Sequence, residues 1–361
     1  MEHAALWLCF LFAVVAQCAS ATCLSPPVNE TRLLSVTGGH YLFIRLFGCA
    51  SGPAVLFLHG GWGPHPADES QDAGGLIDGA RYLIVMFHQR GWGQSMPSGD
   101  ISHNSLADSV ADCEAVREAA GVDSWATVYG GSNGATLGLA YASTKPHRVG
   151  GIVLRGLWLI RERDLIHDYC AVSGKASYFP HEWDTFAAKV GCGRAAASNC
   201  SGLALVERYQ ALLDRPGPEA QAAADAWLAY DALGASVHPA VPGSGWTFPT
   251  TALATARLGV NLYLSHATDP GEVGGLNLLQ TAARRLGGGR MPFRLVTGSY
   301  DMLCPPSMAY EVAAELGDVA ALRVVSGASH SARDPGMTAV IRESIDAMAQ
   351  GGVPELNKDE I

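Results

Sequence analysis

The sequence predicts an α/β domain built on a mostly parallel, doubly wound sheet with helices on both faces. Three observations lead to this fold class. Continuous apolar runs, such as Ala54 to Leu58 and Tyr82 to Phe87, are typical of strands that are covered on both faces. Apolar residues at helical spacing follow, as from Ser105 to Ala119. Strand-like and helical segments then alternate along the chain, which indicates parallel strands joined by helices.

Length and composition agree with such a domain plus an insertion. The chain has 361 residues, which is more than one small domain needs. Hydrophobic residues make up 48% and charged residues 16%, values that favour a globular protein with a well-buried core. The formal net charge is −10 and no long basic run occurs. Because phosphate binding needs clustered Lys and Arg, nucleic acid is not expected as a partner.

The first half of the chain supplies most of the expected sheet. A hairpin is expected from Leu33 to Phe47, with its turn at Gly38-Gly39. Asn104 is the expected N-cap of the helix that begins near Ser105. The further expected elements are strands at 54–58, 82–87, 125–129 and 149–155, and a helix at 135–143. Together these segments form the first part of the core, residues 22–156.

The pattern changes between residues 157 and 289, which are rich in Ala, Trp and Tyr. Two stretches rich in turn-forming residues, 214–219 and 238–251, interrupt this segment, which indicates a largely helical insertion that forms a cap. Strand character resumes at 292–297 and 321–326, and a last helix is expected at 337–349. The expected domains are therefore a core of 22–156 and 290–350, a cap of 157–289 and a tail of 351–361.

Residues 1–21 have the pattern of a secretory signal peptide. An apolar run from Ala4 to Ala16 precedes Ala19-Ser20-Ala21, small residues that suit signal peptidase. The run is short for a bilayer span, and no later segment is apolar and long enough to span one. No Lys or Arg precedes the run, so an uncleaved membrane anchor stays open as the alternative.

The end of the chain and its cysteines bear on localisation. Lys358-Asp359-Glu360-Ile361 differs by one conservative change from the Lys-Asp-Glu-Leu signal of the endoplasmic reticulum. With the signal peptide, this predicts the secretory pathway, with either the lumen of the reticulum or the cell exterior as destination. Seven cysteines follow residue 21, and an odd number leaves at least one thiol free. Candidate disulfides are Cys192 with Cys200 and Cys23 with Cys49.

The strongest chemical signal is the pattern G-x-S-x-G at Gly130 to Gly134, between an expected strand and an expected helix. In this context the serine lies on a sharp, strained turn that exposes its oxygen at the top of the sheet. The glycines let the backbone turn without side-chain clashes. Ser132 is therefore the candidate nucleophile of an α/β-hydrolase fold, and an ordinary glycine-rich turn is the alternative.

A serine needs a base, and the chain offers partners in the order that this fold uses, Ser, Asp, His. Asp301 and His330 each follow an expected strand, at the sheet edge where doubly wound folds place their sites. His330 would take the proton of Ser132, and Asp301 would orient the imidazole and stabilise its charge. Either residue alone could be a solvated loop side chain, but their joint occurrence favours a catalytic triad.

The same reaction needs hydrogen-bond donors for the oxyanion. The backbone N–H of Asn133 is one candidate because this residue follows the nucleophile. The second is expected in the glycine turn after the first core strand, at Gly61 or Trp62.

Metal and cofactor chemistry have weak support in the sequence. His59, His65 and His88 lack the tight spacing of metal ligands, and no C-x-x-C pair occurs. Neither a metal nor an organic cofactor is therefore expected, since triad chemistry uses only side chains and backbone donors.

Several motifs together resemble those of the proline iminopeptidases, serine peptidases with an α/β-hydrolase core and a helical cap. HGGWG at His59 to Gly63 is similar to the HGGPG turn of that family, and HQRGWGQS at His88 to Ser95 to its DQRGxGxS. GGSNGATL at Gly130 to Leu137 is similar to GGSWGSTL. The segments Val153–Gly156, Tyr300–Pro306 and Ala328–Ala332 match as well, so that the likeness runs from about residue 33 to residue 349.

The departures from the family pattern concern substrate recognition. Trp62 replaces the proline of the turn, His88 replaces an aspartate, and Asn133 replaces the tryptophan after the nucleophile. The resemblance implies that cap carboxylates bind the free amine of the substrate. Tyr230-Asp231 stands at the place of a Trp-Glu pair and keeps a shorter acid.

The second family carboxylate is missing from the corresponding stretch, Leu258 to Asn261. An amine buried without partners is costly, so this loss should weaken amine recognition. Arg155 is retained and, with Tyr230 and Asp231, is an expected substrate-binding residue.

Three hypotheses follow for a protein that takes small peptides or esters. The first is an aminopeptidase that releases N-terminal proline or another small residue by a Ser-His-Asp acyl-enzyme mechanism. The second is an esterase or amidase of the same fold that needs no free amine. The third is a non-catalytic lumenal binding protein, against which the complete triad argues.

Overall fold

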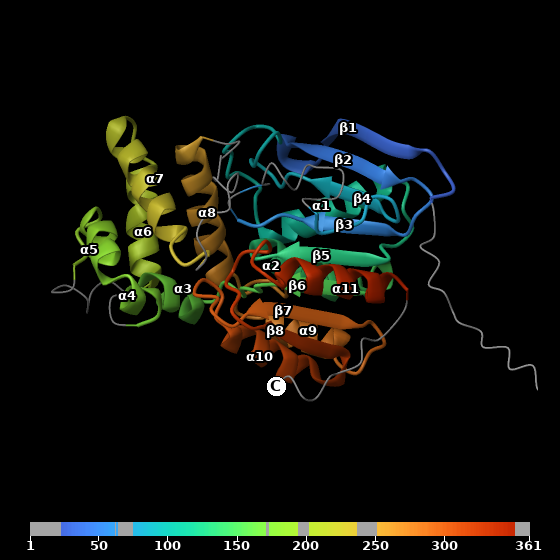
Figure 1. Cartoon of the computed structure of the whole chain (residues 1–361). Coiled ribbons are helices and arrows are strands. Elements are labelled where there is room, and N and C mark those ends of the chain that lie inside the picture. The colour runs from blue at the N-terminus through green and yellow to red at the C-terminus, as the bar shows by residue number, and fades with distance from the viewer. Residues whose placement is uncertain are drawn as a thin grey trace, which may run out of the picture.

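The computed structural model describes residues 23–61, 63, 75–170, 173–193, 202–236 and 251–350 (Figure 1). The expected signal peptide, residues 1–21, and the expected tail, 351–361, lie outside these ranges. Trp62, Cys200 and the C-terminal tetrapeptide are outside them too. Within the described part of the chain, no helix has the length and apolar character needed to cross a membrane.

The core is an eight-stranded sheet, and this confirms the expected fold class. The strand order is β1-β2-β4-β3-β5-β6-β7-β8. β1 and β2, and β2 and β4, pair antiparallel, whereas β3 to β8 pair parallel with their neighbours. The strands are β1 (Pro27–Ser35), β2 (Tyr41–Cys49), β3 (Ala54–Leu58), β4 (Leu83–Phe87), β5 (Thr127–Gly131), β6 (Ile152–Arg155), β7 (Phe293–Gly298) and β8 (Ala320–Val325).

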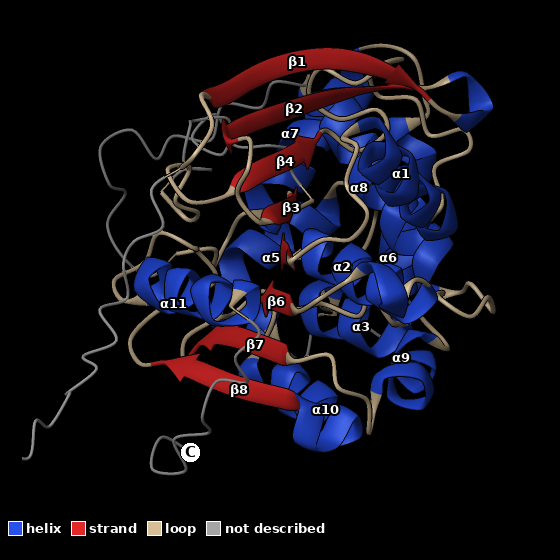
Figure 2. Ribbon diagram, turned by 90° about the vertical axis from the view of Figure 1, so that its right-hand side faces the viewer, coloured by secondary structure: helices blue, strands red, loops and turns tan. Residues whose placement is uncertain are grey.

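Helices cover both faces of this sheet (Figure 2). In β3, Leu56 and Leu58 point into the core on one face, and Val55 and Phe57 into the core on the other. Because successive side chains of a strand alternate between faces, burial on both sides explains the continuous apolar runs. α1 (Leu106–Ala119), α2 (Asn133–Thr144), α9 (Leu278–Leu286) and α10 (Pro306–Leu316) pack on the first face, and α11 (Met337–Ala349) packs on the second.

The expected hairpin is confirmed as the antiparallel pair β1 and β2. A disulfide joins Cys23 to Cys49, as expected from the sequence, and ties the start of the described chain to the end of β2. Cys192 is also disulfide-bonded. The pairing expected for it with Cys200 involves a residue outside the described ranges. Among the described residues, Cys113, Cys170 and Cys304 are free thiols.

The N-cap of α1 is Ser105, and the expectation of Asn104 is wrong by one residue. The Ser105 hydroxyl accepts the N–H of Asp108, and the Asp108 carboxylate accepts the N–H of Ser105. This reciprocal pair satisfies two otherwise unpaired donors of the first helical turn. The Asn104 amide instead donates to the carbonyl of Arg90 at 3.1 Å and to that of Asp100.

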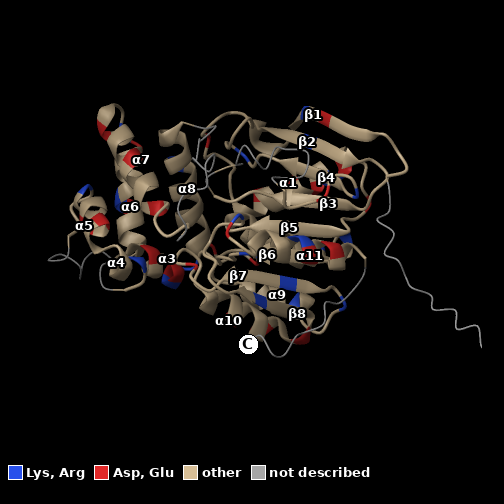
Figure 3. Ribbon diagram, viewed as in Figure 1, with Lys and Arg blue, Asp and Glu red and all other residues tan. Residues whose placement is uncertain are grey.

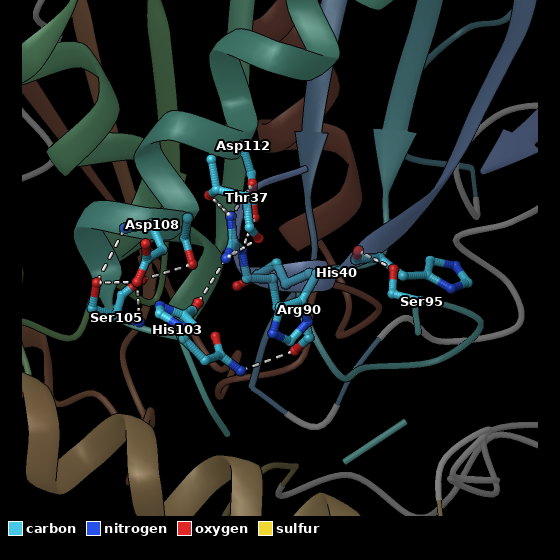
Figure 4. A network of polar contacts seen from close by, with 12 residues as sticks. Thr37, His40, Arg90, Ser95, His103, Ser105, Asp108 and Asp112 are labelled. Atoms are coloured by element: carbon cyan, nitrogen blue, oxygen red, sulfur yellow. Dashed lines mark hydrogen bonds and ion pairs between the residues drawn. The ribbon is translucent and has the colours of Figure 1, made fainter. Parts of the chain in front are cut away.

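Arg90 ties three segments of the chain together (Figure 4). The side chain is completely buried, and its guanidinium donates two hydrogen bonds, of 2.7 and 2.8 Å, to the carboxylate of Asp112 on α1. A third nitrogen donates to the carbonyls of Thr37 and His103. A buried charge pair of this geometry loses several kcal/mol when one partner is removed. Arg90 therefore fixes the loop after β4, which includes its neighbour Gln89.

In the described part of the insertion, six helices form a separate cap beside the sheet (Figure 1). Their shared core contains large aromatic residues, among them Tyr169, Trp183 and Trp227. Tyr169 stacks on Trp227 with ring centroids 5.0 Å apart. The cap helices are α3 (Glu162–Tyr169), α4 (Lys175–Tyr178), α5 (Pro180–Ala188), α6 (Gly202–Leu213), α7 (Pro218–Asp231) and α8 (Ala252–Ala267).

The expected cap range of 157–289 contains one helix that packs elsewhere. Leu278, Leu279, Ala282 and Leu286 of α9 are buried in the core that the sheet shares with α2. The cap therefore ends near the end of α8, before the boundary expected at residue 289. An amphipathic helix does not reveal in its sequence which of two cores its apolar face enters.

Candidate active site

Ser132 lies at the sharp turn between β5 and α2. Its backbone has φ 56° and ψ −125°, an uncommon and strained conformation for a residue with a side chain. A Cβ atom at Gly130 would lie 2.2 Å from the carbonyl oxygen of Gly134, and one at Gly134 would lie 2.3 Å from that of Leu58. Both glycines of the motif are therefore sterically required, which supports a nucleophile elbow over an ordinary glycine-rich turn.

His330 and Asp301 are in direct contact. The Nδ1 atom of His330 lies 2.9 Å from Oδ2 and 3.1 Å from Oδ1 of Asp301, and both side chains are buried. Asp301 also accepts the backbone N–H groups of Leu303 and Cys304. An ionised carboxylate only accepts, so Nδ1 of His330 carries the proton and Nε2 is left to accept one. This is the tautomer that a general base for a serine needs.

One pocket is lined by the expected nucleophile, the expected base and one expected cap acid. Ser132 and His330 line it from the core, and Asp231 lines it from the cap. The space between the lining residues, together with the open solvent at its mouth, is about 930 Å³. Gly156 is also required there, because a Cβ atom at its φ of 55° would lie 2.9 Å from Cε1 of His330.

Arg155 lines the same pocket and supports the base. Its guanidinium donates to the main-chain carbonyl of His330. A Cβ atom at Gly131 would lie 2.5 Å from the guanidinium, so Arg155 also packs against the nucleophile turn. Arg155 therefore holds together the turn with Ser132 and the loop with His330.

Gly61 and Asn133, the two described residues among the expected oxyanion donors, lie side by side in the pocket. Both line the pocket, and a Cβ atom at Gly61 would lie 2.0 Å from the side-chain nitrogen of Asn133. Asn133 is the first residue of α2, and the first N–H groups of a helix have no partner within the helix. The third expected donor residue, Trp62, lies outside the described residues.

His59 sets the orientation of this turn. Its Nε2 accepts the N–H of Gln89 at 3.0 Å, so Nδ1 carries the ring proton and donates to the carbonyl of Gly60 at 2.7 Å. The carbonyl of Gly60 and the N–H of Gly61 belong to one trans peptide and point in opposite directions. By holding the carbonyl, His59 directs the N–H of Gly61 away from its own ring.

Burial of two histidines predicts a loss of stability in acid. Burial lowers the pKa of His59 to about 3 and that of His266 to about 4. Each therefore binds a proton more tightly when unfolded, and the stability that it contributes is full above pH 6.5 and falls as pH drops towards these values. At pH 5 we expect each to cost about 2 kcal/mol.

Thermal unfolding between pH 7.5 and pH 4.5 measures this effect. His266→Phe should flatten the slope, whereas substitution of the exposed His181 by Asn should not. An equal slope in wild type and His266→Phe would contradict the assignment of His266.

Tyr230 does not line the pocket, and its expected role in substrate binding is corrected. Tyr230 and Asp231 are consecutive in α7, so their side chains point about 100° apart and cannot both face the pocket. The Tyr230 hydroxyl instead donates to the main-chain carbonyl of Asp168 at 3.0 Å. Its ring stacks on that of Phe186, with centroids 4.3 Å apart.

Sequence reasoning missed Asp168, which lines the pocket from α3. The sequence contains only a weak indication of this role. Asp168 follows Leu165 by three residues, which places it on the buried face of an otherwise charged helix. An acid on such a face needs a partner or a function, because an unpaired buried charge is costly.

Among the residues that the structure describes, one group of side chains has donor atoms close enough to hold a metal. Atoms of Asp301, Cys304 and His330 lie within 4.8 Å of one another. Asp301 and His330 already bond to each other, and burial together with Asp301 raises the pKa of the Cys304 thiol. A protonated thiol is a poor ligand, so this set fits a catalytic pair better than a metal site.

Comparisons with known proteins place this chain in a family. The profile of the alpha/beta hydrolase fold matches residues 53–334. A proline iminopeptidase from Arabidopsis thaliana is 32% identical over 308 residues, which cover 85% of this chain and 76% of that protein. One from Neisseria gonorrhoeae is 32% identical over 315 residues, with 87% and 94% covered.

This chain belongs to the proline iminopeptidase family of α/β hydrolases. Solved structures agree on the α/β-hydrolase fold. A proline iminopeptidase-related protein from Thermus thermophilus has a TM-score of 0.52 at 21% identity, with 90% of this chain and 99% of that chain covered. An esterase from Exiguobacterium antarcticum has a TM-score of 0.59 at 16% identity, with 88% and 99% covered. The family is one of hydrolases, and the pocket described above is its candidate active site.

Proposed function

We propose that this hydrolase is a serine aminopeptidase that releases N-terminal proline or another small residue from peptides. The observation that carries the proposal is a pocket lined by Ser132 and His330 on the core side. On its cap side the pocket has an acidic wall, formed by Asp168 and Asp231. A peptide with a protonated amino end can place its ammonium at the wall and its first carbonyl at the serine. The relatives named proline iminopeptidase support the choice of substrate.

In the proposed mechanism, His330 accepts the proton of Ser132 at Nε2 as the serine oxygen attacks the first carbonyl carbon. Asp301 stabilises the imidazolium through Nδ1. The N–H groups of Asn133 and of the glycine turn stabilise the oxyanion. His330 then protonates the leaving amine, and water hydrolyses the acyl-enzyme by the same route. Each step uses only groups of this chain and water.

The alternative is an esterase or amidase that needs no free amine, as the solved esterase structure of the same fold illustrates. Turnover of the 2-naphthylamides of proline, alanine and leucine, compared with their N-acetylated forms and a short-chain ester, separates the two. Cleavage of free-amine substrates alone supports the aminopeptidase. Cleavage of acetylated substrates or esters alone would refute it and leave the hydrolase intact.

We also propose that the enzyme acts in the secretory pathway, in the lumen of the endoplasmic reticulum or outside the cell. The Cys23–Cys49 disulfide supports this, because disulfides persist in oxidising compartments. Expression of the full chain and of a chain that lacks the last four residues, followed by assay of medium and cells, tests the proposal. Retention lost on deletion supports the lumen, and a cytosolic full-length protein would contradict export.

A further inference from the structure

The cap presents a carboxylate to the pocket that has no hydrogen-bond donor. Asp168 is 5% exposed and lines the pocket, and its Oδ1 atom is buried. Within the part of the chain that the structure describes, no donor lies within hydrogen-bonding distance of this oxygen. A buried acceptor without a donor costs free energy, so an oxygen in this position is well placed to receive a donor from a ligand.

The main chain of Asp168 is held firmly in this place. Its carbonyl accepts the hydroxyl of Tyr230 at 3.0 Å. The neighbouring residue on α3, Tyr169, donates at 2.6 Å to Oδ1 of Asp231. The two acids are therefore joined through α3 and α7, and both line the pocket. Oδ2 of Asp231 also accepts the hydroxyl of Tyr263 at 3.4 Å.

The charges around this wall leave an excess of negative charge. Lys175 is completely buried behind it, with Nζ 3.3 Å from the main-chain carbonyl of Asp231 and 4.5 Å from the ring centroid of Tyr230. One lysine faces two acids, and Lys175 does not line the pocket. The cap residues that line the pocket include Asp168 and Asp231 and no described cation. Two arginines, Arg155 and Arg333, line the pocket from the core side, and the Arg155 guanidinium donates to the main-chain carbonyl of His330. The cap side of the pocket therefore favours a positively charged group of a ligand.

The helix that would have supplied the second acid of the family pattern has none. The sequence predicts the loss of a carboxylate at Leu258 to Asn261, and α8, which contains this stretch, has no Asp or Glu among its residues (Figure 3). Tyr263 of α8 lines the pocket in that part of the wall. Asp168 supplies a carboxylate to the same pocket from a different helix.

We propose that Asp168 binds the protonated amino group of the substrate through its carboxylate, in the pocket that Asp231 also lines. The ligand class is a primary or cyclic secondary ammonium, and the inference rests on the proposed aminopeptidase function. Asp168 and Asp231 together would then give the substrate amine two carboxylates, although the acid expected on α8 is missing. Burial raises the pKa of Asp168, while Lys175 lowers it and Asp231 raises it further, as expected for an acid that still lacks a cation.

Binding measured without turnover tests this inference. In the Ser132→Ala background, calorimetry gives the dissociation constants of prolinamide and of cyclopentanecarboxamide, in which a methylene replaces the ring ammonium. We expect tighter binding of prolinamide, and Asp168→Asn should weaken it at least about tenfold. The same change should leave cyclopentanecarboxamide within about twofold. Glu162→Gln, an exposed acid on the same helix, should change neither constant.

A structural role for Asp168 would give a different pattern. Since asparagine has the size of aspartate and has no charge to bury, we expect an unchanged or higher melting temperature. Equal weakening of both ligands together with a lower melting temperature would overturn the inference, as would an unchanged dissociation constant for prolinamide.

The proposed function fails in a distinguishable way. In that case wild type would not cleave prolyl naphthylamide, although prolinamide would still bind in a manner that depends on Asp168.

Discussion

Ser132→Ala should lower kcat by about a millionfold, to a residual rate set by the oxyanion donors and by substrate binding. The reason is geometric. Ser132 stands in a backbone conformation that a side chain rarely adopts, at the floor of the pocket that His330 lines. No other hydroxyl at that turn can replace its oxygen. Because alanine removes only this oxygen, KM should change much less than kcat.

The measurement is steady-state turnover of the best substrate from the naphthylamide series, together with mass spectrometry after treatment with a fluorophosphonate. Wild type should gain one label on Ser132, and Ser132→Ala none. Substitution of the exposed Ser307 by Ala is the matched control and should leave rate and labelling unchanged. Retention of more than about one hundredth of the activity by Ser132→Ala would contradict the proposed nucleophile.

The sequence was sufficient to predict the sheet and the sharp turn on which Ser132 lies. In apolar runs such as Leu56 to Leu58, consecutive residues alternate between two buried faces, and the run therefore identifies a parallel strand correctly. The turn at Ser132 is also indicated locally, since a Cβ atom at Gly130 would meet the carbonyl oxygen of Gly134 four residues later. Features fixed by neighbours in the chain can be predicted from the chain alone.

Features fixed by contacts between distant segments could not be predicted in the same way. The Tyr169–Asp231 hydrogen bond joins residues 62 positions apart, and no local pattern indicates it. The place of Asp168 in the pocket depends on that packing of α3 against the rest of the cap. The expectation that α9 belongs to the cap is wrong for the same reason, because its apolar face is equally suited to either core.

Two smaller errors had signals that the sequence contains. Consecutive residues of a helix point about 100° apart, which excludes a shared role in one pocket for Tyr230 and Asp231. Ser105 and Asp108 have the spacing of a capping box, whereas Asn104 does not have an acid three residues later. Both rules concern local geometry and apply to the sequence alone.

Asp301→Asn should reduce kcat by about ten-thousandfold and leave the fold intact. Asp301 fixes the proton on Nδ1 of His330, 2.9 Å away, and so keeps Nε2 free to accept the proton of Ser132. The amide of asparagine can donate to Nδ1, which then accepts, and the ring proton moves to Nε2. A histidine in that tautomer cannot act as the base, although every side chain stays close to its place.

This reasoning also predicts how the triad variants combine. The Ser132→Ala, Asp301→Asn double variant should be no slower than Ser132→Ala alone, because without the nucleophile the tautomer of His330 no longer matters. Independent roles would instead multiply the two losses. Asp318→Asn, an exposed acid in the turn before β8, is the control and should retain full activity. If Asp301→Asn kept kcat within tenfold of wild type, the tautomer of His330 would have to be fixed by a group other than Asp301, and the pair would be structural.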